Sequence, residues 1–257
     1  YEPVAIDLNA ASGQNLKHTV TLRRRIHMAE KGWWSGDLHA HRDPADMPAL
    51  MEAADLNFAP TLTHWNDRPL LESWPAQKIY PDAQGRTYSI HNAEDERAWG
   101  AALFLNLRSP IRLYRPRSEY PPPTVTWQEA RANGAYIDLE KMIWWQAPVI
   151  TALSIPDSLG LACNHFMEEG MMDAEAWGRP RDRVKYPGQS GFAQYVLDLY
   201  YNYLGAGLRL PASAGSANGV LKNPIGYNRS YVMLDEPYSY DKWLAGQKAG
   251  RNFVTNG

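Results

Sequence analysis

The chain has 257 residues, of which 44% are hydrophobic and 21% are charged, a composition typical of a globular protein with a sizeable core. The formal net charge is −2 and no block of like charges occurs, so the bulk positive charge that holds a nucleic-acid backbone is missing. A single cysteine, Cys163, excludes an internal disulfide framework and a four-cysteine zinc site.

Neither end of the sequence carries a recognisable processing signal. It starts at Tyr1 without an initiator methionine or a signal-peptide pattern, and it stops abruptly at Gly257. We therefore expect flanking domains of a longer polypeptide. No apolar run approaches the roughly 18 residues that a membrane-spanning helix needs. The location stays open, with periplasm or secretion preferred to cytoplasm, and the chain is compatible with an oligomer.

The first 30 residues differ from the rest of the chain. Residues 4–8 and 19–22 are predicted to form short strands on either side of a turn at Gly13. Residues 1–30 are therefore expected to be either the tail of a preceding β-domain or an edge hairpin. Residues 31–257 are expected to form the main domain.

From residue 37 onward, short apolar runs that predict strands alternate with patterns that predict helices. The runs are continuous rather than alternating, as in strands buried on both faces of a sheet. The predicted strands cover residues 57–63, 101–107, 135–139, 149–153, 159–162 and 207–211.

Four helices are predicted in the same region. An apolar repeat at helical spacing begins at Met47, with Asp46 placed to cap it. A capping-box spacing opens at Thr126, and Ser239 precedes the last helix. Alternating strands and helices favour a parallel α/β arrangement, and for one domain of this length a (β/α) barrel. The predicted helices cover residues 47–54, 126–133, 192–205 and 240–249.

Several predicted strands end in a residue that can bind a metal ion. In a parallel barrel the carboxyl ends of all strands open on one face, so these side chains are expected to converge in one cleft. Glu94 is a further candidate, although a single acid is most often a solvated surface group. The candidates at strand ends are His39, His41, His64, Glu140 and His165.

His39 and His41 form the strongest pair. Residues two apart on a strand point to the same side, so the two imidazoles can chelate a divalent cation. Asp37, two residues earlier, is placed to act as a further ligand or to orient a histidine. The alternative interpretation is two exposed or separately hydrogen-bonded histidines.

Other catalytic patterns are absent from the sequence. There is no Gly-x-Ser-x-Gly elbow, no P-loop and no Gly-x-Gly-x-x-Gly fingerprint. The tryptophan pairs at residues 33–34 and 144–145 are compatible with stacking on sugars or aryl groups, and equally with core packing.

The Gly-Asp-Leu-His-Ala-His run at residues 36–41 resembles motif I of the PHP (polymerase and histidinol phosphatase) superfamily. Further stretches are similar to its carbaryl-hydrolase-like branch, the CehA/McbA metallohydrolases. The resemblance spans about residue 31 to the end of the chain. These further stretches are residues 31–36, 94–97, 164–165, 212–216, 226–229 and 249–257.

This resemblance implies a distorted (β/α)7 barrel that binds two or three divalent metal ions. It also implies hydrolysis of phosphoesters or, in this branch, of carbamate and other ester or amide-like bonds. By position, His39 and His41 match the first two ligands, and Glu94 matches a bridging carboxylate. His64 and His165 match later ligand positions, although the residue before His64 is threonine instead of the usual aspartate.

Two departures from the family pattern bear on the number of metal ions. The last motif, usually Asp-x-His, reads Ser-Ala-Asn-Gly at residues 216–219, so Ala217 and Gly219 leave both expected ligands missing. Glu140 and Lys141 stand where His-Pro is usual. These losses would reduce the site to one or two ions or mark a non-catalytic descendant.

The leading hypothesis is a metal-dependent hydrolase of a small-molecule substrate. One to three divalent ions, either zinc or manganese/iron, would activate a water molecule for attack on a phosphoryl or carbonyl centre. Asp37 and Arg97 are the expected catalytic residues, with Arg97 anchoring an anionic substrate group. The second hypothesis is a catalytically degenerate barrel that acts as a structural, assembly or glycan-binding module.

Overall fold

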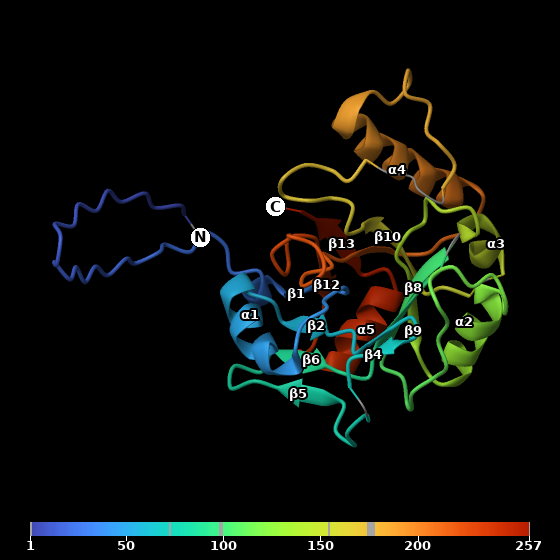
Figure 1. Ribbon diagram of the computed structural model, residues 1–257, viewed down its shortest axis with the longest axis horizontal. Coiled ribbons are helices and arrows are strands. Elements are labelled where there is room, and N and C mark those ends of the chain that lie inside the picture. Colours follow the sequence, from blue (N-terminus) through green and yellow to red (C-terminus); the bar gives the residue numbers. More distant parts are fainter. Residues whose placement is uncertain (1, 72, 98–99, 154, 174–177, 257) are drawn as a thin grey trace.

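The computed structural model describes residues 2–71, 73–97, 100–153, 155–173 and 178–256, and two mixed β-sheets form its centre (Figure 1). In spatial order, the first sheet comprises β13 (Asn252–Thr255), β12 (Arg229–Met233), β1 (Trp33–Gly36), β2 (Phe58–Pro60), β6 (Thr87–Ser89) and β5 (Ile79–Pro81). The second comprises β11 (Ala212–Ala214), β10 (Ser158–Ala162), β9 (Tyr136–Leu139), β8 (Gly100–Leu105), β7 (Ala93–Arg97), β3 (His64–Trp65) and β4 (Arg68–Pro69).

The expectation of a distorted (β/α)7 barrel is wrong. In such a barrel every strand is parallel to its neighbours and is followed by a helix. Here β8 pairs antiparallel with both β7 and β9, and β12 pairs antiparallel with both β1 and β13. Among the described residues the strands stay in two separate sheets without barrel closure, so the fold is richer in β-structure than the predicted alternation.

Helices cover the outer faces of the sheets and fill the space between them. In the described part of the chain, α2 packs on β8 and β9, α4 on β10, α1 on β2, and α5 on β12 (Figure 1). The helices are α1 (Met47–Ala54), α2 (Pro123–Ala132), α3 (Ala147–Ala152), α4 (Gly188–Gly205) and α5 (Tyr240–Lys248), with short 3-10 turns at Ala29–Lys31 and Pro44–Asp46.

Trp243 of α5 anchors one of the hydrophobic cores between the two sheets. Its ring stacks on Phe58 of β2 at 4.0 Å between centroids, and the same cluster contains Leu103 from β8. Gly36, the last residue of β1, leaves room for this ring, because a Cβ there would lie 2.5 Å from it. The strand that leads into the histidine pair is thereby pressed against the core.

The sequence predicted four of the six strand segments within a few residues, namely those that contain β2, β8, β9 and β10. Residues 149–153 lie mainly in α3, because a short apolar run alone does not distinguish a strand from a helix. Residues 207–211 contain no strand, and β11 begins directly after them. The helix α2 begins at Pro123, so Thr126 is not its cap.

Residues 2–27 form neither of the two predicted strands. They run as an extended loop that projects from the rest of the molecule (Figure 1), with one backbone hydrogen bond between Glu2 N and Arg23 O joining its limbs. None of the helices in the described parts of the chain combines the length and apolar character that crossing a membrane requires.

Candidate metal centre

The segment that carries the two histidines is fixed by Asp37. This buried carboxylate accepts hydrogen bonds from the backbone N–H groups of His39 (3.0 Å), Ser216 (3.0 Å) and Gly226 (2.7 Å). Burial raises the pKa of Asp37, and these hydrogen bonds oppose the rise. The predicted catalytic residue Asp37 therefore ties the histidine segment to two distant loops, which is a positioning role.

The structure brings His39, His41 and Glu94 together. His39 Nε2 lies 2.9 Å from His41 Nε2 and 3.4 Å from Glu94 Oε2, and His41 Nε2 lies 3.0 Å from the same oxygen. His39 and Glu94 are buried, and His41 is the partly exposed member. Two imidazoles from the segment after β1 and one carboxylate from β7 thus meet at the edge of the core.

These three atoms fit the requirements of a transition-metal ion. Ligands bonded at about 2.0–2.2 Å stand roughly 3.0–3.5 Å apart in common coordination geometries, which is close to the three separations found here. Glu94 Oε2 is buried, and no hydrogen bond satisfies it within the described residues. A His2Glu set that leaves a position open is characteristic of catalytic zinc sites.

Glu140 supports His39 from the opposite side of its ring. Its Oε1 lies 3.1 Å from His39 Nδ1, so an N–H at Nδ1 donates to the carboxylate and leaves Nε2 free to bind a metal ion. Burial would raise the pKa of Glu140, but Lys141 and His39 lower it to about 2. Glu140, predicted to be a ligand, contacts the His39 ring on the side away from His41 and Glu94.

The electrostatics of the cluster favour a cation. Burial alone would lower the pKa of His39, but the carboxylates of Glu94 and Glu140 raise it to about 10. Glu94 has its pKa lowered despite its burial, chiefly by His39. The cluster therefore attracts positive charge, which a divalent ion or a proton can supply.

Three residues of the site were not assigned a role from the sequence. Glu96 follows Glu94 by two positions on β7 and so projects to the same face. Trp65 pairs in register with Glu94, and its ring lies 5.1 Å from that of His41. Lys141 Nζ donates to Glu140 and, at 3.1 Å, to Glu96. The period of two along β7 was a signal that could have identified Glu96.

The other two histidines predicted to be metal ligands, His64 and His165, stay outside the three-residue group. His64 precedes Trp65 on β3, so it projects to the face opposite Glu94, and burial lowers its pKa. His165 follows β10 and is buried against Phe192, with its Nδ1 lacking a hydrogen bond among the described residues. Burial and the nearby Lys141 lower the pKa of His165 to about 4, so it is neutral at physiological pH.

Arg97 is engaged inside the protein. It is fully buried, and it donates two hydrogen bonds of 2.7 Å to the carboxylate of Asp95 and others to Thr126 and to the carbonyl of Pro121. It lies on β7 but projects to the face opposite Glu94, towards α2. The structure therefore places the predicted substrate anchor in the core.

The segment at residues 216–219 packs closely against the histidine segment and contributes no residue to the three-residue group. Ala217 and Gly219 have positive φ angles of 51° and 101°. The side-chain oxygen of Asn218 accepts from Arg42 Nε, and its NH2 group donates to Asn223 O. Gly215 lets this segment approach closely, because a Cβ there would lie 2.5 Å from His39 Cβ.

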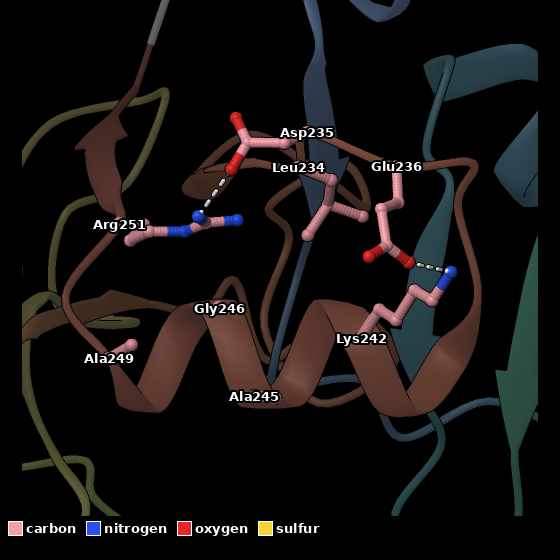
Figure 2. Close-up of a pocket in the computed structure, with 8 residues that line it drawn as sticks. All are labelled: Leu234, Asp235, Glu236, Lys242, Ala245, Gly246, Ala249 and Arg251. Atoms are coloured by element: carbon pink, nitrogen blue, oxygen red, sulfur yellow. Dashed lines mark hydrogen bonds and ion pairs between the residues drawn. The ribbon is translucent and has the colours of Figure 1, made fainter.

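A separate surface pocket lies along α5 and contains none of the clustered residues (Figure 2). Its charged side chains pair with one another, Arg251 with Asp235 and Lys242 with Glu236, each pair at 2.6 Å. Since its charged side chains are paired with one another, we assign it no chemistry.

Comparison with known proteins identifies a fold neighbour and no family. No protein-family profile matches the chain, and no curated protein matches it. The chain is similar to the crystal structure of PsfC from Pseudomonas syringae PB-5123, with a TM-score of 0.51 and 14% sequence identity over 88% of this chain and 92% of that chain. At this identity the likeness concerns the fold alone.

Proposed function

We propose that the chain is a metal-dependent hydrolase that binds a divalent transition-metal ion, such as zinc, manganese or iron, through His39, His41 and Glu94. The observation that carries this proposal is the convergence of three ligand atoms within 2.9–3.4 Å of one another. One of them, the buried Glu94 Oε2, has no well-formed hydrogen bond within the described residues. The resemblance of residues 36–41 to the first PHP motif supports the same chemistry.

The side chains around His39, His41 and Glu94 would have separate roles in such a site. When bound, a divalent ion supplies Lewis acidity that lowers the pKa of water and stabilises developing negative charge. Glu140 keeps the His39 ring in the ligating tautomer. Trp65, His41 and Glu96 are the partly exposed members, so substrate approach is expected from their side. The proposed substrate is a small phosphoester, ester or carbamate.

Metal content and hydrolysis test the proposal together. Protein purified without chelator is analysed for bound metals by mass spectrometry and assayed on aryl phosphate, aryl ester and aryl carbamate substrates. We expect bound transition metal, chelator-sensitive hydrolysis, and loss of both in His39→Ala. The exposed His27→Ala provides the control, because His27 lies outside the cluster. Absence of transition metal from the unchelated protein would refute the proposal.

A second candidate is a catalytically degenerate domain with a structural, assembly or glycan-binding role. The observation that favours it is the 216–219 segment, in which Ala217 and Gly219 offer no ligand and the Asn218 side-chain oxygen is engaged by Arg42. Metal bound without hydrolysis of any of the three substrate classes would favour this candidate over the hydrolase.

A further inference from the structure

Lys141 is a buried cation in contact with two carboxylates beside the proposed metal site. Its side chain is 2% exposed. Nζ donates to Glu140 Oε2 and, at 3.1 Å, to Glu96 Oε1, and it lies 5.2 Å from the centre of the Trp144 ring. A buried ammonium is retained at such a place only when its charge is paired, which both carboxylates accomplish.

The hydrogen bonds of Glu140 leave it without a free oxygen. Oε1 accepts from His39 Nδ1 at 3.1 Å and from the backbone N–H of Asn164 at 3.3 Å, and Oε2 accepts from Lys141. Glu96 contributes one oxygen to the same ammonium. A second metal ion placed between Glu96 and Glu140 would need the two oxygens that Lys141 holds, Glu96 Oε1 and Glu140 Oε2.

Charge balance points in the same direction. Among the described residues, the carboxylates that form ion pairs with the side chains of His39, His41 or Lys141 are Glu94, Glu96 and Glu140. Asp37 bonds to the backbone N–H of His39 instead. With neutral imidazoles, three negative charges face one ammonium, which leaves two negative charges. A single divalent ion neutralises that excess, and a second one would add two further positive charges to a largely buried site.

We propose that the Lys141 ammonium occupies the position between Glu96 and Glu140 that a second metal ion would need, so that the chain binds one divalent ion and no second. This inference rests on the proposed metal site at His39, His41 and Glu94. Lys141 is then a positioning residue that sets the number of ions by its charge and by its hold on Glu140.

The number of bound ions tests the inference directly. Chelator-treated wild-type protein is titrated with Mn²⁺, and bound metal is counted by mass spectrometry while electron paramagnetic resonance detects coupling between neighbouring ions. We expect one ion per chain and no coupling. In Lys141→Ala, which frees both carboxylates and leaves space, we expect two ions and a coupled spectrum. Lys242→Ala removes an ammonium paired with Glu236 on the surface and should still bind one ion.

The outcomes separate this inference from the proposed function. No ion in the wild-type protein would overturn both, whereas two ions in the wild-type protein would overturn only the role of Lys141. A Lys141→Ala protein that gives the wild-type circular dichroism spectrum and still binds one ion would also overturn it. If that variant does not fold, the wild-type count of one or two still decides.

Discussion

Replacing Glu140 by glutamine should weaken metal binding without removing a ligand. In the wild-type protein the carboxylate accepts on both oxygens, from His39 Nδ1 on one side and from Lys141 Nζ on the other. A glutamine amide has one oxygen and one NH2 group of nearly the same shape. Whichever way the amide turns, its NH2 group faces a donor, so either His39 or Lys141 loses its acceptor.

The size of the effect follows from the role of the carboxylate. Loss of a residue that orients a ligating histidine typically costs about 10–100-fold in metal affinity, which corresponds to about 1.4–2.7 kcal/mol. Loss of one of three direct ligands would cost much more. The 3.1 Å separation between Glu140 Oε1 and His39 Nδ1 places Glu140 in the first category.

A competition titration against a chromophoric zinc chelator measures this difference. Glu236→Gln is the matched control, because Glu236 pairs with Lys242 at the surface and is 69% exposed. We expect Glu140→Gln to bind zinc about 10–100-fold more weakly than wild type and the control to differ by less than about twofold. Unchanged affinity in Glu140→Gln would refute the orienting role, and undetectable zinc binding would show that Glu140 is itself a ligand.

Three further expectations follow from the same geometry. Burial lowers the pKa of His39, but the two carboxylates beside it raise it to about 10, so metal must displace a proton. Apparent zinc affinity should then rise about tenfold per pH unit between about pH 6.5 and 8.5, and a flat profile in the same titration would contradict this. Arg97→Met removes the ion-pair partner of the buried Asp95 and should lower the free energy of unfolding in urea by about 3 kcal/mol, with zinc stoichiometry unchanged. A changed number of bound zinc ions would show that Arg97 contributes to the metal site. Gly215→Ala places a Cβ 2.5 Å from His39 Cβ and should destabilise the protein by about 1–3 kcal/mol in thermal unfolding, whereas Gly205→Ala, with open space around it, should not. Equal melting temperatures for the two variants would contradict the packing argument.

The local part of the site could be predicted from the sequence. His39 and His41 stand two residues apart in an extended segment, and that spacing alone places both rings on one side. The structure brings their Nε2 atoms to 2.9 Å. The partner from a distant element, Glu94, was suggested by its position in a resembling family, because nothing in its immediate sequence marks it as buried.

The strand β7 shows why the sheet arrangement could not be predicted. Its sequence, Ala-Glu-Asp-Glu-Arg, has four charged residues in five and reads as a solvated surface segment. In the structure Glu94 and Glu96 project to the face that carries His39 and His41, while Asp95 and Arg97 neutralise each other against α2. Burial of this strand depends on pairing with partners far away in the chain, which local hydrophobicity does not reveal.

The antiparallel pairs were missed for a related reason. A continuous apolar run such as β8 indicates burial on both faces, and parallel sheets are the commonest setting for such strands. In this fold β8 is buried on both faces although both of its neighbours, β7 and β9, run antiparallel to it. The apolar run therefore predicted the strand correctly. The parallel direction that we inferred from it was wrong.

Anomalous X-ray diffraction at the zinc edge, from crystals grown with zinc and without chelator, tests the central claim most directly. We expect one peak per chain, at about 2.0–2.2 Å from His39 Nε2, His41 Nε2 and Glu94 Oε2. A map without a peak at this place, with the two imidazoles and the carboxylate hydrogen-bonded only to one another, would contradict the account.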